Sequence, residues 1–332
     1  MKKAMITALW CMLLTTLFAG SAFAQELLVG GQVVGIQVGI KGVLVAGISQ
    51  VETTEGSLSP AEEAGLKTGD LIVAINGKDI ESAAGLIDSV AALEGKTAQL
   101  SVVREGKTLS FTVQPVQAAE GQWMMGLFLR DSVSGIGTLT FFDPASGVYG
   151  ALGHSISDAE TGMQIELSEG SISRAEILSV NPGSAGTPGE LNGAADLGSV
   201  LGSIDKNTDH GIYGKAYTAL GKGSFETGKI TTGEARILST VEGREPAEYA
   251  VEINRVYHDA EGEHVMLTVT DTELTAKTGG IVQGMSGSPI IQQGKLVGAV
   301  THVFVNDPTR GYGVSIQDML RSAGLSVEEK AA

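Results

Sequence analysis

The sequence predicts a mainly β protein of two domains, and three observations support this. Glycine supplies 46 of the 332 residues, about twice its usual share, whereas aromatic residues make up only 5%. Short segments rich in Val, Ile and Thr recur between Gly, Asn, Asp and Pro over residues 30–324. The chain is also long enough for two domains. We therefore expect short strands and tight turns rather than helical bundles.

The first 24 residues have the pattern of a secretory signal peptide. Lys2 and Lys3 precede an apolar run from Ala4 to Ala19, and an A-x-A cleavage site ends at Ala24. An uncleaved membrane anchor is the alternative, although the run is shorter than the roughly 20 residues that a bilayer needs. We expect an exported protein that contacts a membrane only if this leader is retained.

Cysteine content and charge exclude several classes of function. Cys11, the only cysteine, lies in the leader, so the mature chain would have no disulfide, no thiol nucleophile and no cysteine-ligated metal. Loss of the two leader lysines would take the formal net charge from −16 to −18. Such acidity argues against nucleic acid and anionic lipid as partners. We expect no cofactor and no metal.

Residues 30–116 predict a small domain in which strands alternate with two helices. A short helix starts at Ser59 and ends at Gly65, and apolar spacing indicates a second helix over Ser82–Leu93. Between them lies AGLKTGDLIVAINGK, residues 64–78, which resembles the signature of PDZ domains. Residues 117–122 would be a polar linker.

The PDZ resemblance implies a peptide-binding site. In such domains a peptide adds as a strand beside the second helix, and backbone amides of a glycine-containing loop hold its terminal carboxylate. The resemblance places that loop before the first apolar strand, with Val34, Gly35 and Ile36 as the peptide-binding residues. The expected ligand is a peptide or the target protein itself.

Residues 123–324 consist of many short β segments separated by turn residues. A stretch of this length suits a β-barrel or a double barrel. A final helix over Ile316–Ala323 would pack outside it, and residues 325–332 would be a tail.

Ser286 lies in the segment GMSGSP, residues 284–289. Flanking glycines allow a tight turn, because glycine tolerates positive φ. Such a turn can direct the amides of Gly284 and Ser286 at one point, as an oxyanion hole requires. The alternative is a glycine-rich hairpin in which the serine is only a turn residue.

His154 is the candidate general base. It follows an apolar segment, and the glycine before it and the small residues after it leave room for a nucleophile. A turn histidine near a strand end is the alternative. Asp271 ends a β-prone segment and could orient the imidazole, although an ordinary strand-end aspartate fits equally. Asp158, Asp205 and Asp209 are rival acids.

Two other histidines surround a cluster of acidic residues. His258 and His264 bracket Asp259, Glu261 and Glu263. These are metal-ligating residue types, but the spacing between two β segments favours an acidic hairpin tip over a metal site.

Two long motifs together indicate a family. They are YGALGHSISD at residues 149–158 and GGIVQGMSGSP at the start of residues 280–314. Behind a leader and a PDZ-like segment, they resemble the stage IV sporulation protein B serine peptidases over essentially the whole mature chain. The resemblance implies a trypsin/chymotrypsin-like double β-barrel for residues 123–324.

The same resemblance assigns the site residues. Ser286 would be the nucleophile, His154 the general base and Asp271 the orienting acid of an acyl-enzyme mechanism. Met285 stands where chymotrypsin-like peptidases have aspartate, so activation through an ion pair between that residue and a new N-terminus is excluded.

The resemblance also implies a role in sporulation signalling. Family members are exported to the space between forespore and mother cell, where they cleave a regulatory partner of a membrane-embedded protease, and a sigma-factor precursor is then processed. They also cleave themselves near the N-terminus. A non-catalytic exported adaptor or sensor is the main alternative. An envelope quality-control protease would carry its PDZ domain after the peptidase domain.

Overall fold

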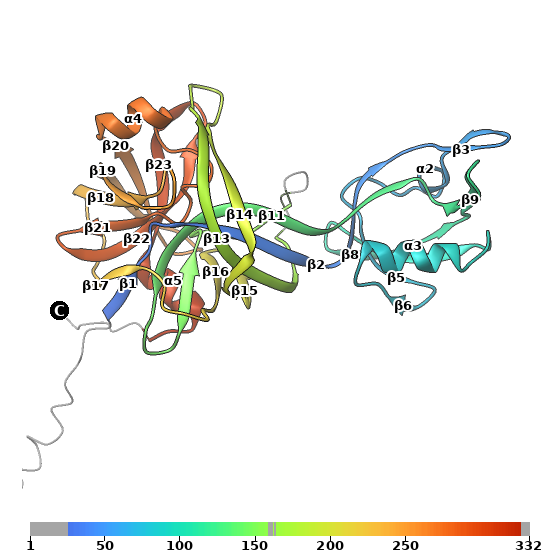
Figure 1. The fold of residues 1–332 in the computed structure, drawn as a ribbon, viewed down its shortest axis with the longest axis horizontal. Helices are drawn as coiled ribbons and strands as arrows, with labels where there is room; N and C mark the ends of the chain where they lie inside the picture. Colours follow the sequence, from blue (N-terminus) through green and yellow to red (C-terminus); the bar gives the residue numbers. More distant parts are fainter. Residues whose placement is uncertain (1–25, 159–161, 163, 327–332) are drawn as a thin grey trace, which may run out of the picture.

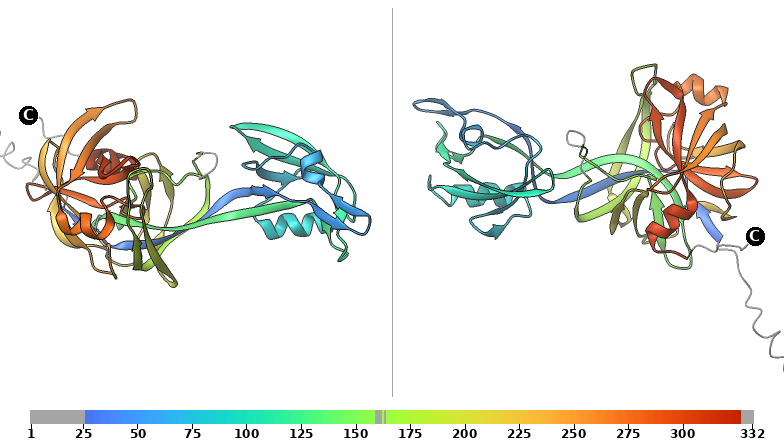
Figure 2. Two further views of the ribbon diagram at one scale, coloured as in Figure 1. Left: turned by 90° about the horizontal axis from the view of Figure 1, so that it is seen from above. Right: turned by 180° about the vertical axis from the view of Figure 1, so that it is seen from behind.

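The computed structural model describes residues 26–158, 162 and 164–326, which form two bodies joined by a two-stranded ribbon (Figures 1 and 2). The predicted leader and most of the predicted tail lie outside these residues. The strands are β1 (Glu26–Val29), β2 (Val33–Ile48), β3 (Val51–Thr53), β4 (Gly56–Leu58), β5 (Leu71–Ile75), β6 (Lys78–Asp79), β7 (Ala98–Arg104), β8 (Lys107–Val113), β9 (Val116–Gln117), β10 (Trp123–Met124), β11 (Leu127–Phe142), β12 (Val148–Ala151), β13 (Leu167–Asn181), β14 (Glu190–Ser203), β15 (Lys206–Thr208), β16 (Gly211–Lys215), β17 (Lys222–Glu226), β18 (Gly233–Ser239), β19 (Ala247–His258), β20 (Glu263–Val269), β21 (Pro289–Gln292), β22 (Lys295–Phe304) and β23 (Asp307–Ser315). The helices are α2 (Pro60–Glu63), α3 (Ala83–Ala91), α4 (Thr272–Thr278) and α5 (Ile316–Ala323).

The ribbon consists of β2 and β11, and each strand belongs to both bodies. They pair antiparallel from Val33↔Thr138 in the larger body to Ile48↔Leu127 in the smaller one. Val34 and Val38 lie in a core of the larger body, whereas Val43 lies in the core of the smaller body. The smaller body is therefore inserted into the chain of the larger one. The predicted domain boundary at residue 30 is wrong, because β1 and the first half of β2 belong to the larger body.

The smaller body has one apolar core between its sheet and α3. Sheet residues such as Val45, Ile72 and Leu100 pack with Leu86 and Val90 of the helix. Helix α3 starts where the Ser82 side chain accepts a hydrogen bond from the Gly85 amide, as its position before an apolar-periodic segment predicts.

The predicted linker at residues 117–122 is part of this smaller body. It is the turn of a hairpin in which β9 pairs with β10. The turn closes through a hydrogen bond from the Ala118 amide to the Gln122 carbonyl. The ring of Trp123 lies against Gly95, where an added Cβ would come within 2.4 Å of it. The prediction of a linker is wrong because the hairpin has both backbone pairing and a packed aromatic residue.

The larger body contains two barrels, as predicted. In the first, the strand order is β16-β12-β11-β2-β13-β14, and an isolated bridge between Gly202 and Ala216 joins β14 to the end of β16. The second is a closed barrel in the order β18-β19-β20-β23-β22-β21. Strand β1 and the first half of β2, which precede the inserted body, add to the strands of the predicted domain at residues 123–324.

Helix α5 covers both barrels at one end (Figure 1). It contacts β12 and β16 of the first barrel and β22 and β23 of the second. Met319 and Leu320 are buried against Leu27 and Phe141. The helix begins at Ser315, whose hydroxyl accepts from the Asp318 amide, and its predicted bounds are confirmed. Within the described chain, no helix is long and apolar enough to cross a membrane.

Candidate active site

Ser286 lies in a turn between α4 and β21, and two positions of this turn require glycine. Gly284 and Gly287 have φ of 98° and 95°, in the region that excludes most side chains. A Cβ at Gly287 would lie 2.0 Å from the carbonyl oxygen of Thr138. Close contact with β11 therefore requires this glycine.

Strand β11 fixes the carbonyl groups of this turn. The Thr138 amide donates to the Ser286 carbonyl at 2.9 Å, and its hydroxyl donates to the Gly284 carbonyl at 2.9 Å. The Thr140 hydroxyl donates to the Gly287 carbonyl at 2.7 Å. These threonines were not predicted, and only their alternation in the segment TLTFF places them on one face of a strand.

The amides of Gly284 and Ser286 differ from that of Gly287 in their hydrogen bonding. Neither donates to an acceptor among the residues that the structure describes. The Gly287 amide, by contrast, is bonded to the Val300 carbonyl at 2.8 Å. The two amides predicted for an oxyanion hole are therefore the ones left without a protein acceptor.

The Ser286 hydroxyl is held by the neighbouring strand β22. Its Oγ donates to the carbonyl oxygen of Thr301 at 2.6 Å. Ser286 is half-buried, and Thr301 is buried. The hydroxyl of the candidate nucleophile is thus held in one orientation, with its hydrogen directed at a backbone carbonyl.

His154 reaches the same strand from the other barrel. It follows β12 after Leu152 and Gly153, whose φ angles are 69° and 73°. A Cβ at Gly153 would lie 3.0 Å from Cγ2 of Thr301, so the backbone before His154 packs directly on the residue that holds Ser286. The structure therefore brings both predicted residues to Thr301, without a direct hydrogen bond between them in the described chain.

The tautomer of His154 follows from its hydrogen bond. Nδ1 lies 2.8 Å from the carbonyl oxygen of Ser155. Because a carbonyl oxygen can only accept, Nδ1 carries the hydrogen and Nε2 keeps its lone pair. Burial lowers the pKa of His154 below its ordinary value, although the hydrogen bond to Ser155 opposes this shift. The ring is therefore a neutral base near neutral pH.

The ring of His302 lies against that of His154. Their centroids are 4.6 Å apart and their planes are tilted by 35°. His302 is exposed at the surface, yet partial burial of its ring, followed by repulsion from His154, lowers its pKa to about 4. The structure thus places His302 against the base.

Asp271 makes no hydrogen bond to His154 within the described residues. Its Oδ1 accepts from the Leu274 amide at 2.9 Å and its Oδ2 from the Ala250 amide at 3.2 Å. The carboxylate is the N-cap of α4, and an aspartate before Thr272 and Glu273 has the pattern of a helix start. The assignment of Asp271 as the acid that holds His154 stays a prediction. Within the described residues, the hydrogen bond of the His154 ring goes to a backbone carbonyl.

Comparison with known proteins identifies the family. A profile for the family described as SpoIVB peptidase S55 matches residues 121–320, which is more than half of the chain. The chain belongs to the SpoIVB peptidase S55 family. A PDZ-domain profile matches residues 46–114. The chain thus combines an S55 peptidase domain with a PDZ domain, which is the smaller body.

Other relatives of this S55 peptidase match over short stretches. It is 45% identical to a probable periplasmic serine endoprotease DegP-like of Chlamydia trachomatis over 60 residues, 18% of this chain and 12% of that protein. It is 40% identical to the zinc metalloprotease RasP of Geobacillus kaustophilus over 63 residues, 18% of this chain and 15% of that protein. The chain thus spans less than a sixth of the length of either relative.

Solved structures are similar only at low sequence identity. The active form of the Rv3671c protease from M. tuberculosis is 12% identical, with a TM-score of 0.35, over 59% of this chain and 77% of that one. The PDZ domain of an SdrC-like protein from Listeria monocytogenes is 22% identical, with a TM-score of 0.20, over 25% of this chain and 87% of that one.

The residues predicted to bind a PDZ ligand lie in the S55 peptidase barrel instead. Val34, Gly35 and Ile36 are buried in β2, paired with β11 on one side and β13 on the other. A Cβ at Gly35 would lie 2.4 Å from that of Ala195, so this glycine permits close packing within the barrel. The prediction is wrong because both edges of the strand are occupied.

The first half of β11 lies beside α3, which is where the peptide-binding loop was expected. It pairs with β2 along one edge, from Leu127 to Arg130, and contacts α3. Helix α3 begins beside it, where the Ala83 amide donates to the Asp131 carboxylate at 2.9 Å. The preceding residue, Gly126, has φ of 75°. Its sequence signal is Gly-Leu-Phe-Leu, which is close to the Gly-Leu-Gly-Phe form of PDZ domains.

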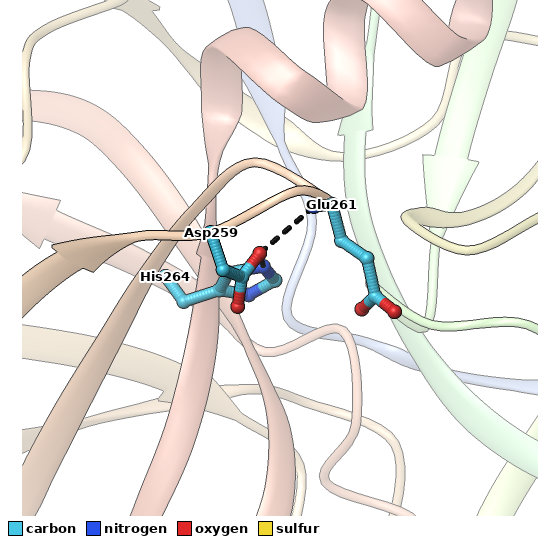
Figure 3. Close-up of side chains that lie close together, drawn as sticks. All are labelled: Asp259, Glu261 and His264. Carbon is cyan, nitrogen blue, oxygen red and sulfur yellow. Dashed lines mark hydrogen bonds and ion pairs between the residues drawn. The ribbon is translucent and has the colours of Figure 1, made fainter.

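The acidic cluster is the tip of the β19–β20 hairpin, as the sequence favours (Figure 3). Side-chain ligand atoms of Asp259, Glu261 and His264 lie within 4.8 Å of one another. The Asp259 carboxylate accepts from the amides of Glu261 and Gly262, and His264 Nε2 lies 3.2 Å from it. These contacts explain the cluster as a closed turn, and we assign no metal to it. His210 Nε2 lies 2.7 Å from the Glu261 carbonyl oxygen at the same tip.

A cleft of about 1030 Å³ lies where the two bodies meet. It is lined from the PDZ side by Leu71 and Glu81 and from the barrel side by Ile165 and Glu166. Ser286 and His154 do not line it, so the chemical site lies elsewhere on the larger body.

Proposed function

We propose that the protein is an exported serine endopeptidase in which His154 activates Ser286. The observation that carries this proposal is the meeting of both residues on Thr301, one through a 2.6 Å hydrogen bond and the other through the backbone packing of Gly153. A neutral imidazole with a free Nε2 is suited to accept the serine proton. The free amides of Gly284 and Ser286 complete the groups that acyl transfer needs.

The reaction would begin when the Ser286 hydroxyl leaves the Thr301 carbonyl. His154 Nε2 takes its proton as Oγ attacks the peptide carbonyl carbon. The carbonyl oxygen becomes an oxyanion that accepts from the amides of Gly284 and Ser286, each donor contributing roughly 3 kcal/mol. The imidazolium then protonates the leaving amine, and an acyl-enzyme remains. Water, deprotonated by the same ring, releases the second product.

The peptide substrate would lie along β22, and the PDZ domain would bind a peptide or the target protein. Since β11 occupies the place beside α3, we propose that the PDZ ligand adds to the edge of β11 near Gly126–Leu129. Phe128 is 61% exposed and Ile87 on α3 is 56% exposed, so apolar side chains are available there. Peptide addition to a strand edge uses main-chain hydrogen bonds for affinity.

Family membership supports a role in sporulation signalling. We propose that the substrate is a membrane-associated regulatory partner of a membrane-embedded protease, cleaved between forespore and mother cell, so that a sigma-factor precursor is processed. Self-cleavage near the N-terminus belongs to the same proposal. A non-catalytic adaptor is the second candidate, favoured only by the absence of a His154–Ser286 hydrogen bond in the described structure.

Labelling by a small sulfonyl fluoride, together with self-cleavage on a gel, tests the peptidase proposal. Wild type should gain one sulfonyl group on Ser286, located by mass spectrometry, and should cleave itself. Ser286→Ala should do neither, whereas Ser110→Ala, at an exposed position on β8, should match wild type. Equal fragmentation of wild type and Ser286→Ala would instead favour the adaptor.

A further inference from the structure

His302 is the side chain next to the base to which the proposed mechanism gives no role. It follows Thr301 on β22, so the residue that holds Ser286 and the residue that stacks on His154 are adjacent in the chain. The centroid distance of 4.6 Å and the 35° tilt fall within the range of favourable offset aromatic pairs.

The hydrogen bond from His154 to the Ser155 carbonyl does not by itself fix the orientation of the ring, so a second contact is needed. The Ser155 carbonyl holds the Nδ1 edge of the ring, and a single in-plane hydrogen bond leaves the ring free to tilt about that bond. A general base works only when its nitrogen lies within hydrogen-bond reach of the nucleophile. Contact with the ring of His302 restricts this tilt.

Other chymotrypsin-like sites use a carboxylate to orient the imidazole. Here Asp271 caps α4, and the described polar and ring contacts of His154 are the hydrogen bond to the Ser155 carbonyl and the tilted contact with the His302 ring. We propose that His302 is a positioning residue that packs its ring against His154 and keeps the Nε2 of His154 directed toward Ser286.

The charge state of His302 is compatible with this role. A pKa of about 4 leaves the ring uncharged at neutral pH, so it does not repel the imidazolium that forms on His154 during acylation. A lysine at this position would place a positive charge beside the same ring and oppose proton transfer.

Replacement of His302 separates stacking from other roles. The proposal rests on the proposed function, so wild-type labelling of Ser286 by the small sulfonyl fluoride is measured first. His302→Ala should lower the labelling rate and kcat by about 3- to 10-fold, the worth of one aromatic pair, with KM within about twofold. His302→Phe keeps a ring and should restore most of the rate, whereas His302→Lys should be slower than His302→Ala.

Control measurements distinguish failure of the proposed function from failure of the positioning role of His302. His258→Ala, at an exposed position on the distal hairpin, should label like wild type. Absence of labelling in wild type would count against the proposed function. If wild type labels and His302→Ala labels at the same rate or faster, or His302→Phe is as slow as His302→Ala, the positioning role is overturned. A raised KM with unchanged kcat would also overturn it, because it would make His302 a substrate contact.

Discussion

At the scale of single residues, two backbone carbonyls organise the site. The Thr301 carbonyl accepts a hydrogen bond from the Ser286 hydroxyl at 2.6 Å. The Ser155 carbonyl accepts one from Nδ1 of His154 at 2.8 Å. A carbonyl can orient a ring as a carboxylate does, but it carries no full charge and stabilises an imidazolium less. Burial lowers the pKa of His154, and the hydrogen bond to Ser155 opposes this shift only in part. The base is thus kept neutral, and formation of its cation is made more costly.

The pH dependence of the reaction should reflect this. His154 acts only when neutral, and its pKa is below the ordinary value near 6.5. As pH falls, kcat/KM should therefore decline with a midpoint below pH 6.5. Sulfonyl fluoride labelling rates measured from pH 4 to pH 8 would show the same limb. A decline that is already half complete at pH 7 would contradict the burial of this ring.

At the scale of elements, turns and helices with local sequence signals could be predicted, whereas strand pairings between distant segments could not. The hairpin after Ser286 turns at Gln293-Gly294, where both residues have positive φ, and a glycine at such a position is a local turn signal. Helix α5 was predicted from its own residues. Strand β2 misled because its β-prone sequence runs from Val33 to Ile48 with only Gln37 and Lys41 as polar interruptions. The change from one core to another depends on β11, which lies some 90 residues later in the chain.

The role of Asp271 is hard to read from sequence for a related reason. An aspartate at the end of a strand and an aspartate at the start of a helix look alike when both follow an apolar segment. Asp271 is both, since β20 ends at Val269 and α4 begins at Thr272. Its two amide partners are Leu274 and Ala250, and Ala250 is distant in sequence.

Asp271 variants distinguish a helix cap from a triad acid. Asp271→Ala removes the acceptor for the Leu274 amide and should lower the free energy of unfolding by about 1 kcal/mol. Asp271→Asn still caps a helix, so it should unfold near wild type and label at Ser286 at nearly the wild-type rate. Denaturant unfolding and sulfonyl fluoride kinetics measure the two effects. A loss of labelling on the order of a thousandfold in Asp271→Asn, with normal unfolding, would support Asp271 as the orienting acid.

At the scale of the whole molecule, the β2–β11 ribbon joins the two functions. Strand β11 lies beside α3 of the PDZ domain at its start and holds the Ser286 turn through Thr138 and Thr140 farther along. The PDZ domain is therefore an extension of one hairpin of the first barrel (Figure 2). Its removal at the ribbon should leave the barrel strands paired.

Two deletions test this insertion. Replacement of residues 41–130 by Asn-Gly would join Ile40 to Asp131 through a two-residue hairpin turn, close to where Gly39 pairs with Ser132. This variant should stay folded and label at Ser286, because the pairing of β2 with β11 and β13 in the barrel is kept. Deletion of residues 30–116, the domain expected from sequence, removes β2 from between those two strands and should unfold the larger body. Circular dichroism melting and sulfonyl fluoride labelling compare them directly. A folded, reactive protein without residues 30–116 would show that β2 is dispensable to the barrel and that the PDZ domain is not an insertion.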